Sequence, residues 1–385
     1  MLSWRLNRAT REDRPNPVLQ GWLVIIFAFI ACEKKQEEVA LNRYPFAISA
    51  PTERQQAFER ELARFEERVR GNPSRDEDLA QLALHYVEKG RRTWDLSWLD
   101  KAEAMAKKSR SVRSNRNRLA DLALAEIASE KYRYDDAIPP LKRILTADPS
   151  DFDAALLLIQ AYLGSGENDV AQTVAESLAK AKPCLKSLIA LGQIYETNGR
   201  AHDAEQAYLA AMTLEGAGDG QASAQVRTLL AQFNINQGKL ENVRWLVNEA
   251  LRIRPDDTRA VQILAELEAQ WGHLELAVEL YAQAYRISPD PQFLVAQAKI
   301  ARRRGDGNAA AELFRHAELA YRERIHQSAV GHRRELAELL LDRGRPQDLV
   351  EALRLVQADA LVRDDQKTRD TLARAQQLNA QLRGE

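Results

Sequence analysis

The sequence predicts an all-α solenoid built from repeated helical hairpins, and three observations support this fold class. Glycines recur along the chain at intervals of 33, 39, 34, 33 and 39 residues, at Gly166, Gly199, Gly238, Gly272, Gly305 and Gly344. Prolines keep the same period, since Pro149 and Pro183 are 34 residues apart, as are Pro255 and Pro289. Apolar residues on both sides of each glycine follow helical spacing. Such a fixed period is typical of repeat architectures and is not expected of a single globular core.

Each repeat has the pattern of two helices joined by a tight turn at the glycine. In one unit Leu156 and Tyr162 precede Gly166, and Val174 and Leu178 follow it, all at helical spacing. Glycine suits such a turn because it adopts the left-handed backbone at little cost. A small residue five positions later would let the second helix approach the first, as at Ala171, Ala204, Ala277 and Ala310. The proline then ends the second helix.

This unit resembles the tetratricopeptide repeat, whose 34-residue pattern fixes the positions of small and large residues. With the glycine at position 15, the matching residues of the unit at Gly166 are Leu158, Ile159, Tyr162, Ala171, Ala175, Leu178 and Pro183. The unit before it places Tyr132 in the glycine position, and the units at Gly305 and Gly344 lack the final proline. The resemblance covers most of residues 76–361. It implies a right-handed α-solenoid of about eight TPR-like helical hairpins with a C-terminal capping helix.

Outside and between the repeats, the sequence predicts further features. Thr52 with Gln55 predicts a capping box, and Phe58, Leu62 and Phe65 form one apolar face after it. The glycine-rich stretch 216–220 predicts a loop in the first 39-residue interval, and Gly90 predicts a turn followed by an insertion over 91–98. Near the C-terminus, one apolar stripe predicts the capping helix, with Leu372, Ala375, Leu378 and Leu382. The predicted domains are a signal peptide or membrane anchor over 1–31, a tether over 32–50, an amphipathic packing helix over 51–71, the repeat solenoid over 72–361 and the capping helix over 362–385.

The amino terminus resembles a bacterial lipoprotein signal. Four arginines between Arg5 and Arg14 precede an apolar run over 21–31 that is too short for a comfortable membrane span, and Cys32 follows it. The resemblance implies that Cys32 is lipidated after cleavage. Glu33 is not the aspartate that retains lipoproteins in the inner membrane, which implies an outer-membrane anchor facing the periplasm. Because Phe29 stands where leucine is usual, a single uncleaved inner-membrane anchor and a wrongly assigned chain start remain alternatives.

Composition and motifs exclude several classes of function. The net charge of -1 gives no general attraction to nucleic acid, so none is expected as a partner. The six histidines show no metal-ligand spacing, and each is expected on a solvated helix face. The repeat turns account for the recurrent glycines, which leaves no phosphate-binding loop. We therefore expect no metal, no cofactor and no enzymatic activity.

The resemblance also implies a concave groove lined by the first helices, which would bind an extended peptide or a partner helix. The candidate groove residues are Glu126, Gln160, Lys186, Gln193, Gln232, Arg259, Glu266, Lys299, Arg302 and Arg303. A row of amides can hydrogen-bond to a peptide backbone without demanding a sequence. The cations from Lys299 to Arg303 would favour an acidic partner segment. The alternative is that all these residues lie on solvated faces without a binding role.

Two functions fit this fold. The first is a non-enzymatic scaffold of the bacterial envelope that helps to assemble an outer-membrane, pilus or secretin, or polysaccharide-export machine. The second is an adaptor or regulator that recruits a periplasmic hydrolase or protease. Both bind protein and both imply contact with a membrane through the N-terminal segment, and no oligomeric state is indicated.

Overall fold

The computed structural model describes residue 46 and residues 50–93, 95–327, 332–362 and 366–383. These residues belong to one compact unit, Phe46–Glu385. The predicted signal segment 1–31, the lipidation site Cys32 and most of the tether 32–50 lie outside the described residues. Within the described part of the chain, no helix is both long and apolar enough to span a membrane.

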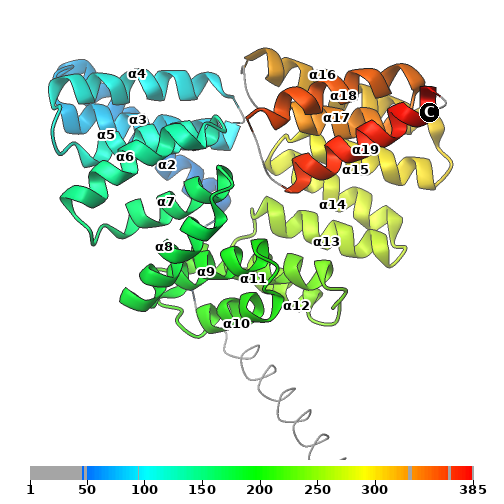
Figure 1. Cartoon of the computed structure of the whole chain (residues 1–385), viewed down its shortest axis with the longest axis horizontal. Helices are drawn as coiled ribbons and strands as arrows, with labels where there is room; N and C mark the ends of the chain where they lie inside the picture. The colour runs from blue at the N-terminus through cyan, green and yellow to red at the C-terminus, as the bar shows by residue number, and fades with distance from the viewer. Residues whose placement is uncertain (1–45, 47–49, 94, 328–331, 363–365, 384–385) are drawn as a thin grey trace, which may run out of the picture. The chain divides into compact units, whose positions relative to one another are not determined.

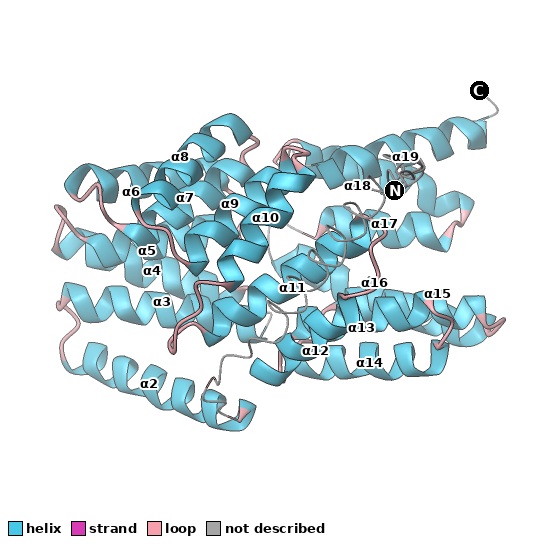
Figure 2. Cartoon of the chain, turned by 90° about the horizontal axis from the view of Figure 1, so that it is seen from below, coloured by secondary structure: helices cyan, strands magenta, loops and turns pink. Residues whose placement is uncertain are grey.

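The described residues form 18 α-helices and no strands (Figures 1 and 2), which confirms the all-α solenoid. The helices span α2 Pro51–Gly71, α3 Asp76–Thr93, α4 Ser97–Val112, α5 Arg118–Glu130, α6 Tyr134–Ala147, α7 Phe152–Gly164, α8 Asn168–Ala181, α9 Leu185–Thr197, α10 Ala201–Met212, α11 Gly220–Asn236, α12 Val243–Ile253, α13 Thr258–Gln270, α14 Leu274–Ile287, α15 Pro291–Arg303, α16 Gly307–Gln327, α17 Arg333–Arg343, α18 Pro346–Ala360 and α19 Gln366–Arg383. Helices α3 to α18 pair as eight consecutive hairpins, and each hairpin packs on the next.

The turns inside the hairpins have the backbone that the glycine period predicts. All six recurrent glycines have positive φ, from 72° at Gly199 to 85° at Gly272. Tyr132, which takes the glycine position between α5 and α6, also has a positive φ of 56°. That conformation costs a non-glycine residue about 1–2 kcal/mol. The geometry of the repeat therefore overrides the preference of the local residue.

Small buried residues set the contact between the two helices of a hairpin. Ala171, Ala204 and Ala277 are fully buried and Ala310 is 3% exposed, each at the start of a second helix. A longer side chain at these places would push the helices apart, since protein interiors are close-packed. Most of the apolar core lies in these contacts within and between hairpins.

The connections between hairpins follow a second recurring pattern. Pro149, Pro183, Pro255 and Pro289 each lie two residues after the end of a second helix. An aspartate then caps the next first helix in several repeats. Asp151 accepts a hydrogen bond from the Ala154 amide at 3.1 Å, and Asp257 accepts one from the Ala260 amide at 3.1 Å. Such caps satisfy backbone donors that a helix start leaves unpaired.

The two 39-residue intervals depart from the regular repeat in different ways. The first contains a loop between Met212 and Gly220, as predicted. A buried ion pair between Arg227 and Glu215 holds this loop, and the Ser223 hydroxyl donates to the same carboxylate at 2.7 Å. The second interval contains the long helix α16.

Two details of the first hairpin region differ from prediction. The capping box of Thr52 and Gln55 is wrong, because Pro51 begins α2 and the Glu53 carboxylate accepts a hydrogen bond from the Ala50 amide. Proline favours this first helical position because its fixed φ suits the helix. The turn at Gly90 is also wrong, since α3 continues to Thr93 and includes the start of the expected insertion.

Helix α19 closes the C-terminal end of the solenoid against α17 and α18 (Figure 2). Ala375 is fully buried there, with Leu372 and Leu378 packed around the same core cluster. The Asn379 amide donates to the Leu349 carbonyl on α18 at 2.7 Å. Leu382 does not belong to this face, because it lies in the last turn of α19 and is 47% exposed.

We predict that Gly192→Ala destabilises the fold. A Cβ at Gly192 on α9 would lie 2.5 Å from the ring of Tyr208 on α10. That ring is fully buried, and its hydroxyl donates to Glu196 at 2.9 Å, so it has little room to move. Despite the better helix propensity of alanine, we expect the free energy of unfolding to fall by about 1–3 kcal/mol. The measurement is the urea midpoint, followed by circular dichroism.

The matched control is Gly307→Ala, since a Cβ at Gly307 meets nothing within 4 Å. This variant should keep or raise the urea midpoint. Equal midpoints for the two variants would show that α9 and α10 are not closely packed at Gly192.

Candidate protein-binding surface

The first helices of successive hairpins share one surface of the solenoid. Helices α3, α5, α7, α9, α11 and α13 each contact the next of this series, although a second helix lies between them in the chain. Side chains from neighbouring first helices are therefore brought within bonding distance. Three hollows lie on this surface, and they contain most of the candidate groove residues.

The first hollow has a volume of about 330 Å³ and is lined by α7, α9 and α11. We call it the amide hollow, after Gln160, Gln193, Gln221 and Gln225 in its wall. The Gln160 amide nitrogen donates to the Gln193 side-chain oxygen at 3.4 Å. Apolar side chains and one cation complete the lining, with Leu156, Leu157, Ile189 and Lys186. Three predicted residues, Gln160, Lys186 and Gln193, thus meet in one place.

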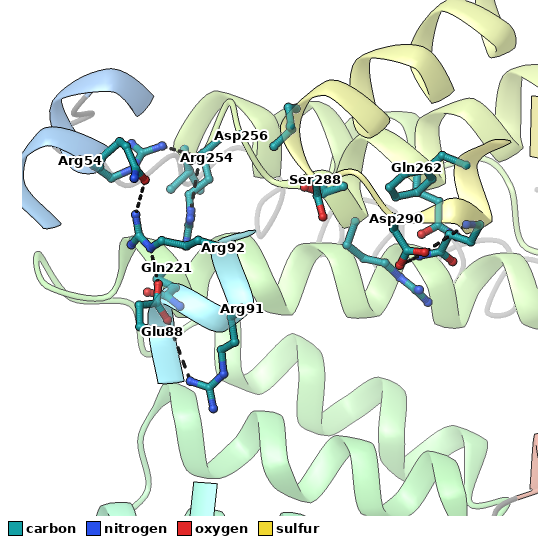
Figure 3. Close-up of a pocket in the computed structure, with 18 of the residues that line it drawn as sticks. Arg54, Glu88, Arg91, Arg92, Gln221, Arg254, Asp256, Gln262, Ser288 and Asp290 are labelled. Carbon is teal, nitrogen blue, oxygen red and sulfur yellow. Dashed lines mark hydrogen bonds and ion pairs between the residues drawn. The ribbon is translucent and has the colours of Figure 1, made fainter. Parts of the chain in front are cut away.

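The second hollow is the largest, at about 650 Å³, and is drawn in Figure 3. We call it the arginine cavity, because five arginines line it: Arg54, Arg91, Arg92, Arg254 and Arg259. They come from α2, α3, the turn before α13 and α13 itself. Three carboxylates also line it, from Glu88, Asp256 and Asp290.

Ion pairs hold the walls of the arginine cavity in place. Arg54 on α2 binds Asp256, which lies 202 residues away before α13. The pKa of Asp256 lies below its ordinary value. Burial raises this pKa, but the hydrogen bond from Arg54 and the charge of Arg254 lower it by more than burial raises it. On the α3 side, Arg92 donates to Glu88 at 2.6 Å and to the Gln55 side-chain oxygen at 3.1 Å.

Arg91 connects the cavity to the next first helix. Its guanidinium donates to Glu126 at 3.0 Å and to Glu130 at 2.7 Å, both on α5. Burial raises the pKa of Glu126, although the charge and hydrogen bond of Arg91 act in the opposite direction. Glu126, a predicted groove residue, thus bridges two first helices.

The third hollow, which we call the mixed-charge hollow, has a volume of about 440 Å³ and is lined mainly by α13, α15, α17 and α19, with one tyrosine each from α14 and α16. It contains three predicted residues, Glu266, Lys299 and Arg303. The four cations in its wall, Lys299, Arg303, Arg334 and Lys367, face four carboxylates, Glu266, Glu335, Glu338 and Asp342. Lys299 lies 2.5 Å from Asp342, and Arg302 donates to the Asp342 carbonyl at 2.8 Å. The expected positive end of the groove is therefore balanced by carboxylates.

Two predicted residues contact each other between these hollows. Arg259, in the arginine cavity, donates to the Gln232 side-chain oxygen at 3.2 Å. The Gln232 amide nitrogen donates in turn to Asn236 on the same helix at 3.2 Å. Gln232 lies in none of the three hollows, whereas Gln225 lines the amide hollow together with Gln193.

Sequence reasoning missed four of the five arginines of the cavity. Arg91 and Arg92 fell in the expected insertion, and only the extension of α3 brings them to this surface. Arg254 belongs to the connection before α13, and Arg54 meets its partner across 202 residues. No short-range sequence pattern could predict that these arginines meet in one cavity.

No group of three or more residues suited to hold a metal ion occurs in the part of the chain that the structure describes. The expectation that every histidine lies on a solvated face is wrong for His332, which is 8% exposed. His85 is also partly buried, with its ring 4.8 Å from that of Phe65. Each packs on an aromatic residue, which accounts for its burial.

Family comparisons agree with the repeat geometry. Two tetratricopeptide-repeat models match residues 128–184 and 185–217. Residues 128–217 are thus similar to tetratricopeptide repeats. The matched region runs from the end of α5 to the loop before α11, and it therefore includes most of the wall of the amide hollow. Arrays of such repeats commonly serve as protein-binding scaffolds.

Among known proteins, cellulose synthase operon protein C of Pseudomonas fluorescens (strain SBW25) is 26% identical over 179 residues. The match covers 43% of this chain but only 14% of that protein. Among solved structures, a monomeric IFIT1 mutant with Gppp-AAAA aligns with a TM-score of 0.53 and 14% identity, over 85% of this chain and 76% of that one. The APC/C hetero-tetramer Cut9-Hcn1 aligns with a TM-score of 0.48 and 17% identity, over 78% of this chain and 63% of that one. The IFIT1 likeness concerns the fold alone.

We predict that Asp342→Asn loosens the C-terminal end of this surface. Asp342 is 13% exposed and pairs with Lys299 on α15 and with Arg374 on α19, the latter at 2.9 Å. Both cations are about half exposed, so the loss should be modest, roughly 0.5–1 kcal/mol. The measurement is hydrogen exchange, which should become faster in the α19 amides. Glu312→Gln, at an exposed position on α16, is the control and should leave α19 unchanged. Unchanged exchange in both variants would show that Asp342 does not fasten α19.

Proposed function

We propose that the protein is a non-enzymatic scaffold of the bacterial cell envelope that binds an extended peptide or a helix of a partner protein. The observation that carries this proposal is the amide hollow on the surface of the first helices. Its four glutamines come from three successive hairpins and line the hollow together with apolar side chains. A single hairpin could not form this site, so the repeat array itself is the binding element.

The chemistry of the amide hollow suits a polypeptide. Each glutamine offers two donors and one acceptor, which can pair with backbone carbonyl and amide groups. The apolar side chains of Leu156, Leu157 and Ile189 in the lining would bury one or two side chains of the bound segment. Lys186 at the edge adds a single positive charge. Such a site would select a chain in an extended form and tolerate different sequences.

Two further observations support a place in the envelope. The N-terminal segment resembles a lipoprotein signal, with Cys32 as the residue that would carry the lipid anchor at the outer membrane. The similarity to a protein named for the cellulose synthase operon favours polysaccharide export among the three kinds of machine considered above. We therefore propose that the solenoid holds a protein component of such a machine on the periplasmic side.

Photo-crosslinking in cells tests the binding surface. A photoreactive residue in place of Gln225, in the amide hollow, should capture a protein that the same residue in place of Gln206 does not. Gln206 is exposed on the second helix α10 and serves as the control. A membrane channel or export component would support the scaffold, and a hydrolase or protease would favour the adaptor. Identical products from both positions would contradict a site on the first helices.

Once the crosslinked partner is identified, the triple variant Gln160→Ala, Gln193→Ala and Gln225→Ala should bind this partner about tenfold or more weakly than the unchanged protein does. Three lost side-chain hydrogen bonds at about 0.5–1.5 kcal/mol each give this size of effect. The matched control changes exposed amides outside the hollow, at Gln206, Gln376 and Gln377. Affinity is measured by calorimetry, with circular dichroism to check the fold. Equal affinity for the two triple variants would contradict a role for the amide hollow.

Replacing Cys32 by alanine tests the anchor. If lipidation at this residue holds the protein on the membrane, the variant should move from the membrane fraction to the soluble periplasmic fraction. Fractionation followed by immunoblotting measures the shift. Retention of the variant in the membrane would instead indicate an uncleaved apolar segment.

A further inference from the structure

The arginine cavity carries an excess of positive charge in a chain that is nearly neutral. Its five arginines face three carboxylates in the lining; with their partners outside the lining, which are Arg324, Glu126 and Glu130, six cations face five carboxylates, and one positive charge is left in excess. The whole chain has a net charge of -1. One of the three carboxylates, Asp290, also lies 3.7 Å from Arg324, a cation outside the cavity lining. The carboxylates of the lining are therefore too few to pair with all five of its arginines.

Two arginines of the cavity have hydrogen-bonding capacity that the described residues do not use. The Nε atom of Arg254 is buried and has no hydrogen-bond partner there, and its ion-pair contact with Asp256 measures 3.7 Å. The exposed Arg259 side chain donates to the neutral amide of Gln232 and forms no ion pair within the described part of the chain. The exposed Arg259 guanidinium can therefore donate to an acceptor on an incoming ligand.

Three helix starts lie in the lining of the cavity. The first turns of α11, α13 and α15 contribute Gly220, Thr258 and Gln292 to its lining. The start of a helix carries a partial positive charge and attracts anions. Asp257 and Asp290 already cap the starts of α13 and α15, so the guanidinium groups are the main attraction for an anionic ligand.

The cavity is connected to the two other hollows. Gln221 lines both the arginine cavity and the amide hollow, and Gln292 lines both the arginine cavity and the mixed-charge hollow. One extended chain can therefore follow the first helices from one hollow to the next. The aromatic residues in the cavity lining, Phe46 and Phe293, are 8% and 2% exposed. They offer no free ring face for stacking of nucleic-acid bases.

We propose that the arginine cavity binds carboxylate side chains of an acidic polypeptide segment whose backbone lies along the amide hollow. This inference rests on the proposed function and specifies the chemistry of the partner. Arginine is suited to the task because its guanidinium can donate two parallel hydrogen bonds to one carboxylate. Arg259 and the exposed part of the Arg254 side chain supply these donors, while Arg54, Arg91 and Arg92 hold the walls through their own ion pairs.

The test uses the full chain and two labelled peptides of about twelve residues, which extend to about 40 Å. One peptide alternates glutamate with serine, and the other alternates glutamine with serine. Fluorescence anisotropy at low ionic strength should show at least about tenfold tighter binding of the glutamate peptide, and this preference should fall as salt is added. The double variant Arg254→Gln and Arg259→Gln should lose about tenfold in affinity for the glutamate peptide.

The charge-matched control is Arg60→Gln with Arg315→Gln, two exposed arginines outside the cavity, and it should bind like the unchanged protein. The single variant Arg259→Gln controls for misfolding of the double variant, because Arg259 does not contact Asp256 as Arg254 does. This single variant should still lose several-fold in affinity for the glutamate peptide. Equal loss in the control pair, or equal binding of both peptides, would overturn the inference.

A single-stranded oligonucleotide of about twelve thymidines tests whether the cavity binds nucleic acid instead of an acidic peptide. If it bound as tightly as the glutamate peptide and lost affinity in the same double variant, the ligand would be a nucleic acid and the inference would be overturned. Crosslinking at Gln225 is independent of these results. If a protein is captured there but the glutamate peptide is not preferred, the scaffold function is supported and only the proposal of an acidic partner segment is contradicted.

Discussion

The close contact of the two helices in each hairpin is the constraint on which the rest of the structure depends. It requires a small residue near the start of the second helix, as at Ala171, Ala204 and Ala277, which are fully buried. It also requires a turn that reverses the chain in few residues, which the left-handed backbone at the recurrent glycines provides. Because most hairpins meet these two requirements, they stack on their neighbours in a similar way.

Regular stacking places all first helices on one surface, and this surface acquires a polar character of its own. Links between successive first helices run from Arg91 to Glu126, from Gln160 to Gln193 and from Arg259 to Gln232. Residues that could bind a partner are thus also residues that join hairpins. A ligand that uses these side chains would change the stiffness of the array, since each contact spans two repeats.

The long-range ion pair between Arg54 and Asp256 gives the largest hollow a wall that the repeats alone would not form. It joins α2, which precedes the hairpins, to the connection before α13. Through this contact the arginines of α2 and α3 share one cavity with those next to α13. Charge is then concentrated at one place on a chain whose composition is balanced, which composition alone could not reveal.

The sequence by itself determined the fold class, the number of hairpins, the turns at the six recurrent glycines and at Tyr132, and the closing helix α19, but not the first turn, which it misplaced at Gly90. These features depend on local backbone preferences and on periodic burial. Both can be recognised in the sequence because they repeat about every 34 residues, even where Tyr132 replaces glycine. The sequence also placed Gln160, Lys186 and Gln193 on one surface, because neighbouring repeats present equivalent positions to the same side. Only the tertiary structure decided that Gln225 completes that group, that Asp342 pairs with Lys299, and that Arg54 meets Asp256. Those contacts join residues at unequal places in different repeats, and their distances depend on how the stacked hairpins turn relative to one another.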